Sequence, residues 1–184
     1  MDLANIPRDL STRDLHLRPQ KMTDADAMFE MLSDPKSMKY WSHPVTDYET
    51  ATQKMREDLE SDARGDSLCW AVTMSGNDIM IGKCILFHFS QENYRAEIGF
   101  ILNRKYWRQG LMHQAVAAVI AFAFNTLKLH RIEADTDPEN VGSLALLEKL
   151  GFEREGLFRE RWFVDGNWLD SVMLGLVYDD SKDK

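Results

Sequence analysis

The sequence predicts a mixed α/β fold (α+β), in which helices pack against one central sheet. Three observations predict it: helical patterns near the N-terminus, a meander of apolar strands in the middle of the chain, and two strand–helix units before a closing pair of strands. The chain has 184 residues and shows no internal repeat, linker or low-complexity segment. We therefore expect a single domain over residues 1–184, with a core from about residue 15 to residue 178.

The first part of the chain predicts one short strand and two helices around an aromatic loop. A polar cluster at residues 23–26 is typical of a helix start, and Asp47 or Thr46 can cap the second helix, which Gly65 ends. In chain order, we expect a strand at residues 15–18, a helix at 27–32, a loop at 39–46 (KYWSHPVT) and a helix at 48–63.

The middle of the chain predicts three strands and one long helix. The strands are expected at residues 68–74, 80–90 and 94–102. A turn (SGND) at residues 75–78 joins the first two. Residues 110–127 are apolar around most of the circumference of a helix, so this helix is expected to lie buried against the sheet.

The last part of the chain predicts a second strand–helix unit and a closing hairpin. Gly151 ends the helix, and a turn at residues 165–167 (DGN) joins the last two strands. In chain order, we expect a strand at residues 131–136, a helix at 141–150, and antiparallel strands at 152–158 and 168–178.

Composition narrows the range of partners. Lys and Arg number 22 and Asp and Glu number 30, a formal net charge of −8, which argues against binding to nucleic acid or to an anionic membrane. Charged residues interrupt any N-terminal signal sequence, and no apolar run reaches the length of a membrane span. Cys69 and Cys84 lie in apolar strands without nearby metal-ligand spacing. We expect a cytoplasmic protein without a metal.

The segment at residues 104–115 (RKYWRQGLMHQA) carries the clearest functional signal. It joins a predicted strand to a predicted helix through a loop with one glycine, Gly110. The first N–H groups of a helix have no internal partner and attract anions, and a glycine lets an anion approach the main chain. The sequence has neither GxxxxGK[ST] nor GxGxxG after a strand, so this phosphate site differs from those of P-loop and dinucleotide-binding proteins.

A second motif identifies the family that the sequence resembles. Residues 107–115 (WRQGLMHQA), 137–143 (DPENVGS) and 146–152 (LLEKLGF) together resemble the GCN5-related N-acetyltransferase (GNAT) superfamily. Within it, they resemble the RimJ/RimL-type acetyltransferases of ribosomal-protein N-termini, and the likeness runs from about residue 15 to residue 177. The resemblance implies the GNAT fold: a mostly antiparallel mixed sheet, splayed at the cofactor and flanked by about four helices.

The resemblance also implies acetyl-CoA as co-substrate. The pantetheine arm would pair with the main chain of Phe100 and Leu102 as an additional strand does. Asn140 would bond the same arm, and its position also suits a helix N-cap; both roles can coexist, because capping leaves the amide NH₂ free. The implied pyrophosphate-binding residues are Arg108, Gln109, Gly110, Leu111, Met112 and His113. The Arg108 side chain either adds charge there or is solvated.

Catalysis needs a proton acceptor for the amine and a proton donor for the departing thiolate. Ser143 matches the general acid proposed for Rim-type enzymes, although its position also suits a capping serine. Glu97 lies where histone-acetylating relatives carry a glutamate base, and it can equally be an exposed strand residue. Some Rim-type enzymes carry a glutamate base where this sequence has Trp162. Glu160 shares a strand face with Trp162 if no bulge intervenes, so Glu160, Glu97 or no residue serves as the base.

The expected acceptor is the α-amine of a protein or peptide N-terminus, such as that of a ribosomal protein. A peptide α-amine, with a pKa of about 7.7–8.0, needs roughly 3 kcal/mol less help in losing its proton than lysine at about 10.4. Trp41 and Trp162 are predicted to line the acceptor site, whereas His43 and His88 have no recognisable partner and no assigned role. A small amine, such as an aminoacyl-nucleotide, an amino acid derivative or a polyamine, or a non-catalytic CoA sensor, is the alternative. The protein is either a monomer or a homodimer.

Overall fold

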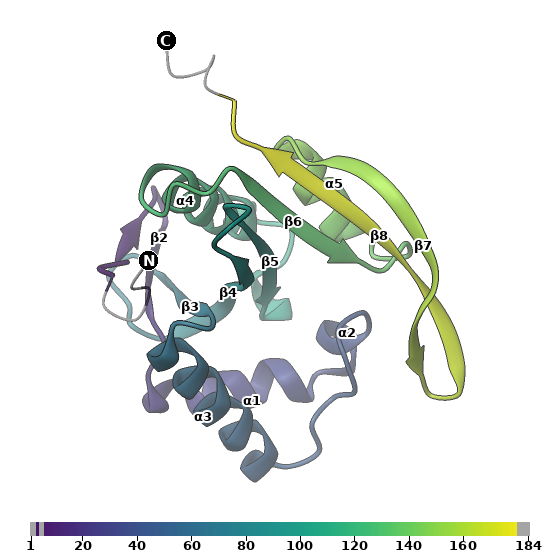
Figure 1. Cartoon of the computed structure of the whole chain (residues 1–184). Helices are drawn as coiled ribbons and strands as arrows, with labels where there is room; N and C mark the ends of the chain where they lie inside the picture. The colour runs from purple at the N-terminus through teal and green to yellow at the C-terminus, as the bar shows by residue number, and fades with distance from the viewer. Residues whose placement is uncertain (1–2, 4–5, 180–184) are drawn as a thin grey trace.

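The computed structural model describes residue 3 and residues 6–179 of the chain (Figure 1). Eight strands form one sheet in the order β1-β2-β3-β4-β5-β6-β8-β7, and only the β5–β6 pair is parallel. The strands are β1 (Leu10–Ser11), β2 (Leu15–Pro19), β3 (Leu68–Met74), β4 (Met80–Ser90), β5 (Arg95–Leu102), β6 (Arg131–Thr136), β7 (Glu153–Val164) and β8 (Asn167–Val177). The mixed, mostly antiparallel sheet predicted from the sequence is confirmed.

The described residues contain five α-helices and two short 3₁₀ turns, one α-helix more than expected. The additional helix is α2, of four residues, which follows α1 directly. The helices are α1 (Ala25–Ser33), α2 (Pro35–Met38), α3 (Tyr48–Arg64), α4 (Leu111–Asn125) and α5 (Val141–Lys149), and the 3₁₀ turns are η1 (Met22–Asp24) and η2 (Arg104–Tyr106). Within residue 3 and residues 6–179, no helix is both long and apolar enough to cross a lipid bilayer.

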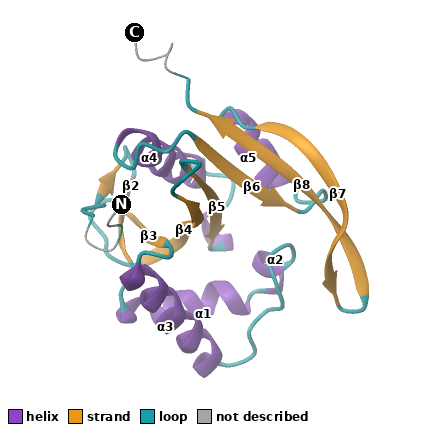
Figure 2. Ribbon diagram, viewed as in Figure 1, coloured by secondary structure: helices purple, strands orange, loops and turns teal. Residues whose placement is uncertain are grey.

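Two apolar clusters cover the two faces of the sheet. The larger one joins α4 and α5 to the sheet, and Trp70 at its centre is fully buried. The Trp70 indole meets Phe122 of α4 edge-on at 5.5 Å and donates a hydrogen bond of 2.8 Å to the Arg8 carbonyl. The smaller cluster packs α1, α2 and α3 on the other face, so that α1 and α3 lie apart from α4 and α5 (Figure 2). The long helix is thus buried, as its apolar circumference predicts.

The β7–β8 hairpin extends beyond the rest of the sheet (Figure 1). β7 is an edge strand whose residues are almost all exposed, and its pairing with β8 is interrupted at two places. Bulges and charged residues are common on edge strands, because they discourage pairing with another chain. The hairpin therefore offers exposed side chains beside the sheet rather than a regular free edge.

Candidate active site

The sheet opens between its two parallel strands. β5 and β6 pair over only three residues, and the last pair is Glu97 with Glu133. Beyond this point β5 stays with β4, and β6 stays with β8. The two strands therefore separate, and each has an edge without a strand partner along the gap. This is the splayed sheet that the resemblance to a known family implies.

The main chain of β5 presents polar groups to this gap. Asn103 directly follows β5, and its N–H donates a hydrogen bond of 2.8 Å to the carbonyl of Ile81 in β4. Since main-chain groups alternate in direction along a strand, those of Phe100 and Leu102 point away from β4 and into the gap. The Leu102 carbonyl already accepts a 2.8 Å hydrogen bond from the Trp107 indole. The Leu102 N–H and both main-chain groups of Phe100 remain for an extended ligand that pairs as a strand does.

The loop after β5 ends in an uncapped helix. Arg108 and Gly110 both have left-handed backbone, with φ of 61° and 73°. The first hydrogen bond of α4 runs from the Gln114 N–H to the Gly110 carbonyl, so the N–H groups of the three residues between them lie outside the helical ladder. A Cβ on Gly110 would meet no atom within 4 Å among the described residues. An anion can therefore approach these amides without obstruction.

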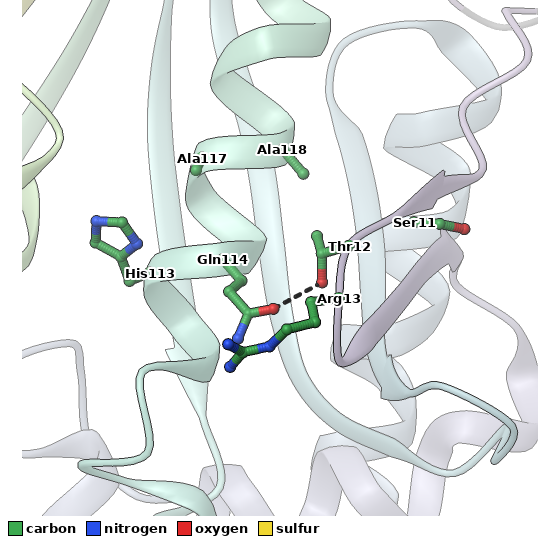
Figure 3. A pocket seen from close by; sticks show the side chains of 7 residues that line it. All are labelled: Ser11, Thr12, Arg13, His113, Gln114, Ala117 and Ala118. Carbon is green, nitrogen blue, oxygen red and sulfur yellow. Dashed lines mark hydrogen bonds between the residues drawn. The ribbon is translucent and has the colours of Figure 1, made fainter.

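The predicted phosphate-binding residues contribute in different ways. Leu111 and Met112 have buried side chains in the core, so only their amides face outward. Arg108 and Gln109 are exposed, and the Gln109 amide donates to the Lys105 carbonyl at 3.2 Å. Exposed His113 borders a shallow pocket of about 550 Å³ beside the helix (Figure 3). The other residues that line this pocket are Ser11, Thr12, Arg13, Gln114, Ala117 and Ala118.

Ion pairs fix the start of this loop to α1. Arg104 Nε lies 2.8 Å from Asp34 Oδ2, and Lys105 pairs with Glu30. The hydrogen bond from the Lys105 ammonium lowers the pKa of Glu30. Because α1 packs on the sheet, the loop is held at both of its ends, by α1 and by α4.

The N-terminus of α5 brings Asn140 and Ser143 together. Asn140 caps the helix, because its Oδ1 accepts the Ser143 N–H at 3.2 Å. The cap leaves the Asn140 NH₂ group available. The Ser143 hydroxyl, half-buried in the first turn, makes no hydrogen bond to any other residue that the structure describes. Ser143 therefore contributes its main chain to the cap and keeps its hydroxyl for another partner.

Glu97 lies at the point where β5 and β6 separate, and its partner is a histidine. Its carboxylate is 3.0 Å from Nδ1 of His88, on a bulge of β4. The Glu97 side chain is 19% exposed and that of His88 is 71% exposed. His88 therefore has a partner that the sequence does not reveal.

The loop of residues 39–46 spans the opening. Lys39 lies 3.7 Å from Glu139 before α5, and His43 lies 3.3 Å from Asp165 at the tip of the β7–β8 hairpin. Between these ties, Trp41 reaches β5: a Cβ on Gly99 would lie 3.5 Å from its ring. Gly99 and Glu97 are two residues apart on one strand, so Trp41 and Glu97 share a face of the sheet.

The condition under which Glu160 and Trp162 would share a strand face, the absence of a bulge, is not met. Between the pairs Phe158–Ser171 and Trp162–Leu169, four steps along β7 face only two along β8. A bulge therefore intervenes, and alternation cannot place the two side chains on one face. Glu160 has left-handed backbone (φ 52°), and its N–H donates to Asp170 Oδ1 at 2.9 Å. Its exposed carboxylate lies in this irregular segment.

Trp162 is about half exposed, and the rings of Trp162 and Phe158 both contact the guanidinium group of Arg161. The Arg161 guanidinium carbon lies 5.3 Å from the Trp162 ring centre and 5.0 Å from that of Phe158. Arg161 Nε also lies 2.8 Å from Asp135 Oδ2. Trp41 and Trp162 belong to the two segments that the His43–Asp165 contact joins. The structure thus brings the segments that carry Trp41 and Trp162 into contact, and it places Trp41 on the face of Glu97.

The two cysteines are poor nucleophiles. Burial raises the pKa of Cys69 to about 11 and also raises that of fully buried Cys84. The reactive form of cysteine is the thiolate, so neither residue is prepared to form a covalent intermediate at neutral pH.

We expect the native protein to release almost no thionitrobenzoate from Ellman's reagent within minutes. The denatured protein, with both cysteines accessible, should release two equivalents. The absorbance at neutral pH measures both values. Rapid reaction of one thiol in the native state would contradict the burial argument.

Comparison with known proteins agrees with this geometry. Residues 14–153 match the model of the acetyltransferase (GNAT) domain. The chain is 36% identical over 169 residues to an uncharacterized N-acetyltransferase, p20, of Bacillus licheniformis, covering 91% of this chain and 95% of that one. It is 37% identical over 83 residues to the ribosomal protein uS5-alanine N-acetyltransferase of Escherichia coli, covering 45% and 43%. The Mycobacterium smegmatis RimJ structure in complex with CoA-disulfide matches with a TM-score of 0.81 and 26% identity, covering 93% of this chain and 88% of that one.

Proposed function

Because the chain belongs to the GNAT acetyltransferase family, we propose that it transfers the acetyl group of acetyl-CoA to the α-amine of a protein or peptide N-terminus. The observation that carries the proposal is the combination of the opened β5 edge with the uncapped α4 N-terminus that follows it. The β5 edge offers main-chain hydrogen bonds of the kind that a further strand would make, and the helix start offers amides for a phosphate. The two lie next to each other along the chain. A phosphopantetheine thioester carries both matching parts in the same order: an arm with amide groups, and then a phosphate.

The described residues fit CoA as a ligand. The amides at residues 108–113 would hold its pyrophosphate, with Gly110 permitting close approach. Phe100 and Leu102 would pair with the pantetheine arm, and the free NH₂ group of Asn140 would bond it from the other side of the gap. The M. smegmatis RimJ protein, similar over most of its length, was solved with CoA-disulfide. With the pyrophosphate at the start of α4 and the arm along β5, the thioester would lie toward Glu97, where the gap closes.

We assign roles at that end of the gap to the remaining predicted residues. Glu97 would accept the proton of the attacking amine through a water molecule, and the Ser143 hydroxyl would protonate the departing thiolate. Attack would be direct, because both cysteines are buried with raised pKa values. Trp41 would line the acceptor's path beside Glu97, and Trp162 would line it from the hairpin.

An α-amine suits a site with one partly buried carboxylate as base. The α-amine is mostly in its neutral form above about pH 8, whereas the lysine side chain stays mostly charged up to about pH 10. The E. coli protein that shares 37% identity over 83 residues is named for acetylating an alanine of ribosomal protein uS5. That activity supports the same acceptor class for this chain.

Thiol release from acetyl-CoA tests the proposal. Peptides with free N-terminal alanine or serine should be acetylated with a kcat/KM at least tenfold above that of the same peptides with a blocked N-terminus and an internal lysine, since less free energy is needed to deprotonate the α-amine. Mass spectrometry of the product locates the acetyl group. Higher kcat/KM for spermidine or an aminoacyl-nucleotide would replace the acceptor, and tight acetyl-CoA binding without turnover on any amine would identify a CoA sensor.

A further inference from the structure

The contact between His88 and Glu97 depends on an irregularity in β4. Phe87 is paired with Glu97 and Ser90 with Arg95, so three steps along β4 face two along β5. Phe87 therefore shares the face of Glu97, and in a regular strand the next residue, His88, would point to the opposite face. The bulge and the left-handed backbone of His88 (φ 51°) turn its ring back to the face of Glu97.

This conformation has a cost that a surface ion pair does not explain. Left-handed backbone is unfavourable for a residue with a Cβ. An exposed ion pair offsets little of that cost. The ring centres of His88 and Phe87 are 4.6 Å apart. This contact orients the His88 ring but leaves its side chain mostly exposed. Strained residues of this kind are concentrated at functional sites.

The charged residues next to Glu97 are engaged with one another, and His88 contacts the Glu97 carboxylate. On β6, the residue beside Glu97 is Glu133, which is engaged by Arg95 of β5 and Arg131 of β6. Among the residues that the structure describes, His88 is the hydrogen-bond partner of the Glu97 carboxylate. The contact thus joins a Glu97 side chain that is mostly buried, at the closed end of the gap, to a His88 side chain that is mostly exposed to solvent.

We propose that His88 is a positioning residue for Glu97 and the exit through which the amine's proton reaches solvent. The inference rests on the proposed function. The amine nitrogen forms a bond to the acetyl carbon while the carbon–sulfur bond breaks, and the sulfur takes the Ser143 proton. The proton released by the nitrogen passes through water to Glu97, then to His88 and to buffer, and Ser143 regains one proton from solvent. Products and reactants differ only by the transferred acetyl group.

Imidazole rescue tests the exit. His88→Ala should lower kcat about tenfold in dilute buffer at fixed pH and ionic strength, and added imidazole should restore most of it, with an unchanged KM for acetyl-CoA. His88→Gln can keep a hydrogen bond to Glu97 but cannot carry a proton, so its kcat should stay low without imidazole and rise with it. His16→Ala is the matched control, because His16 forms an exposed contact of 3.3 Å with Asp9 on the far part of the sheet. Its kcat should be unchanged and insensitive to imidazole.

The outcomes separate the two proposals. An active wild type whose His88→Ala variant keeps its kcat, or loses activity that imidazole does not restore, overturns the proton exit alone. A wild type without turnover on any amine overturns the proposed function and the exit with it. Full activity of His88→Gln without imidazole would also overturn the exit, because positioning alone would then suffice.

Discussion

Replacing Gly110 by valine is expected to raise the KM for acetyl-CoA about 30-fold, roughly 2 kcal/mol of lost binding. A Cβ at this position meets no protein atom within 4 Å in the described structure, so the protein itself leaves room for the side chain. The same space is where we place the pyrophosphate, close to the amides of α4. A branched side chain would hold the phosphates away from these amides and would favour a different backbone at φ 73°. Steady-state kinetics with varied acetyl-CoA give the KM.

Gly76→Val is the matched control for backbone strain. Gly76 lies in the turn between β3 and β4, has a φ of 80°, and would also place a Cβ in open space. Both variants should lose a similar free energy of unfolding in urea, but Gly76→Val should keep the wild-type KM. If Gly110→Val bound acetyl-CoA as the wild type does, the pyrophosphate would lie in another loop. Equal increases in KM for both variants would attribute the effect to stability alone.

Elements whose signals are local in sequence could be predicted closely. The strand at residues 131–136 has the predicted bounds, and Gly65 ends α3 in the left-handed conformation (φ 74°) that a C-terminal glycine favours. No helix is predicted for residues 35–38, where the structure has α2, and Pro35 lies in this segment. Pro35 occupies the first position of α2, with Asp34 as the cap, because a proline without an N–H is tolerated there.

The closing hairpin shows where sequence periodicity stops being informative. The strand expected to end at residue 158 continues to Val164 through a bulge that includes left-handed Glu160. Nothing in the residue order marks this bulge, because the segment is charged and aromatic rather than alternating. A bulge changes which face each later residue occupies, so the condition for a shared face of Glu160 and Trp162 is not met for the same reason.

The two parts of the candidate site differ in the same way. The phosphate loop consists of consecutive residues, so the local geometry at Gly110 follows from the strand–loop–helix pattern. The contacts of His88 with Glu97 and of His43 with Asp165 join residues from different elements. The first of them also requires a bulge. Such contacts depend on register and tertiary packing, which one sequence does not reveal.

Replacing Ser143 by alanine is expected to lower kcat about 100-fold, the usual range for loss of a general acid. The helix should not be affected, because Ser143 contributes its N–H to the cap and its hydroxyl has no partner in the part of the chain that the structure describes. The unfolding midpoint and the dissociation constant of CoA should therefore stay near the wild-type values. Single-turnover kinetics at saturating acetyl-CoA isolate the chemical step from product release.

Asn140→Ala is the complementary variant, because it removes the cap and leaves the Ser143 hydroxyl. It should cost about 1 kcal/mol of stability and weaken CoA binding, since both Asn140 roles are lost. Its kcat at saturating acetyl-CoA should fall much less than that of Ser143→Ala. Ser143→Thr, which keeps a hydroxyl in the first turn, should recover part of the lost kcat. If Ser143→Ala retained the wild-type kcat, water would protonate the thiolate, and Ser143 would be only a helix-start residue.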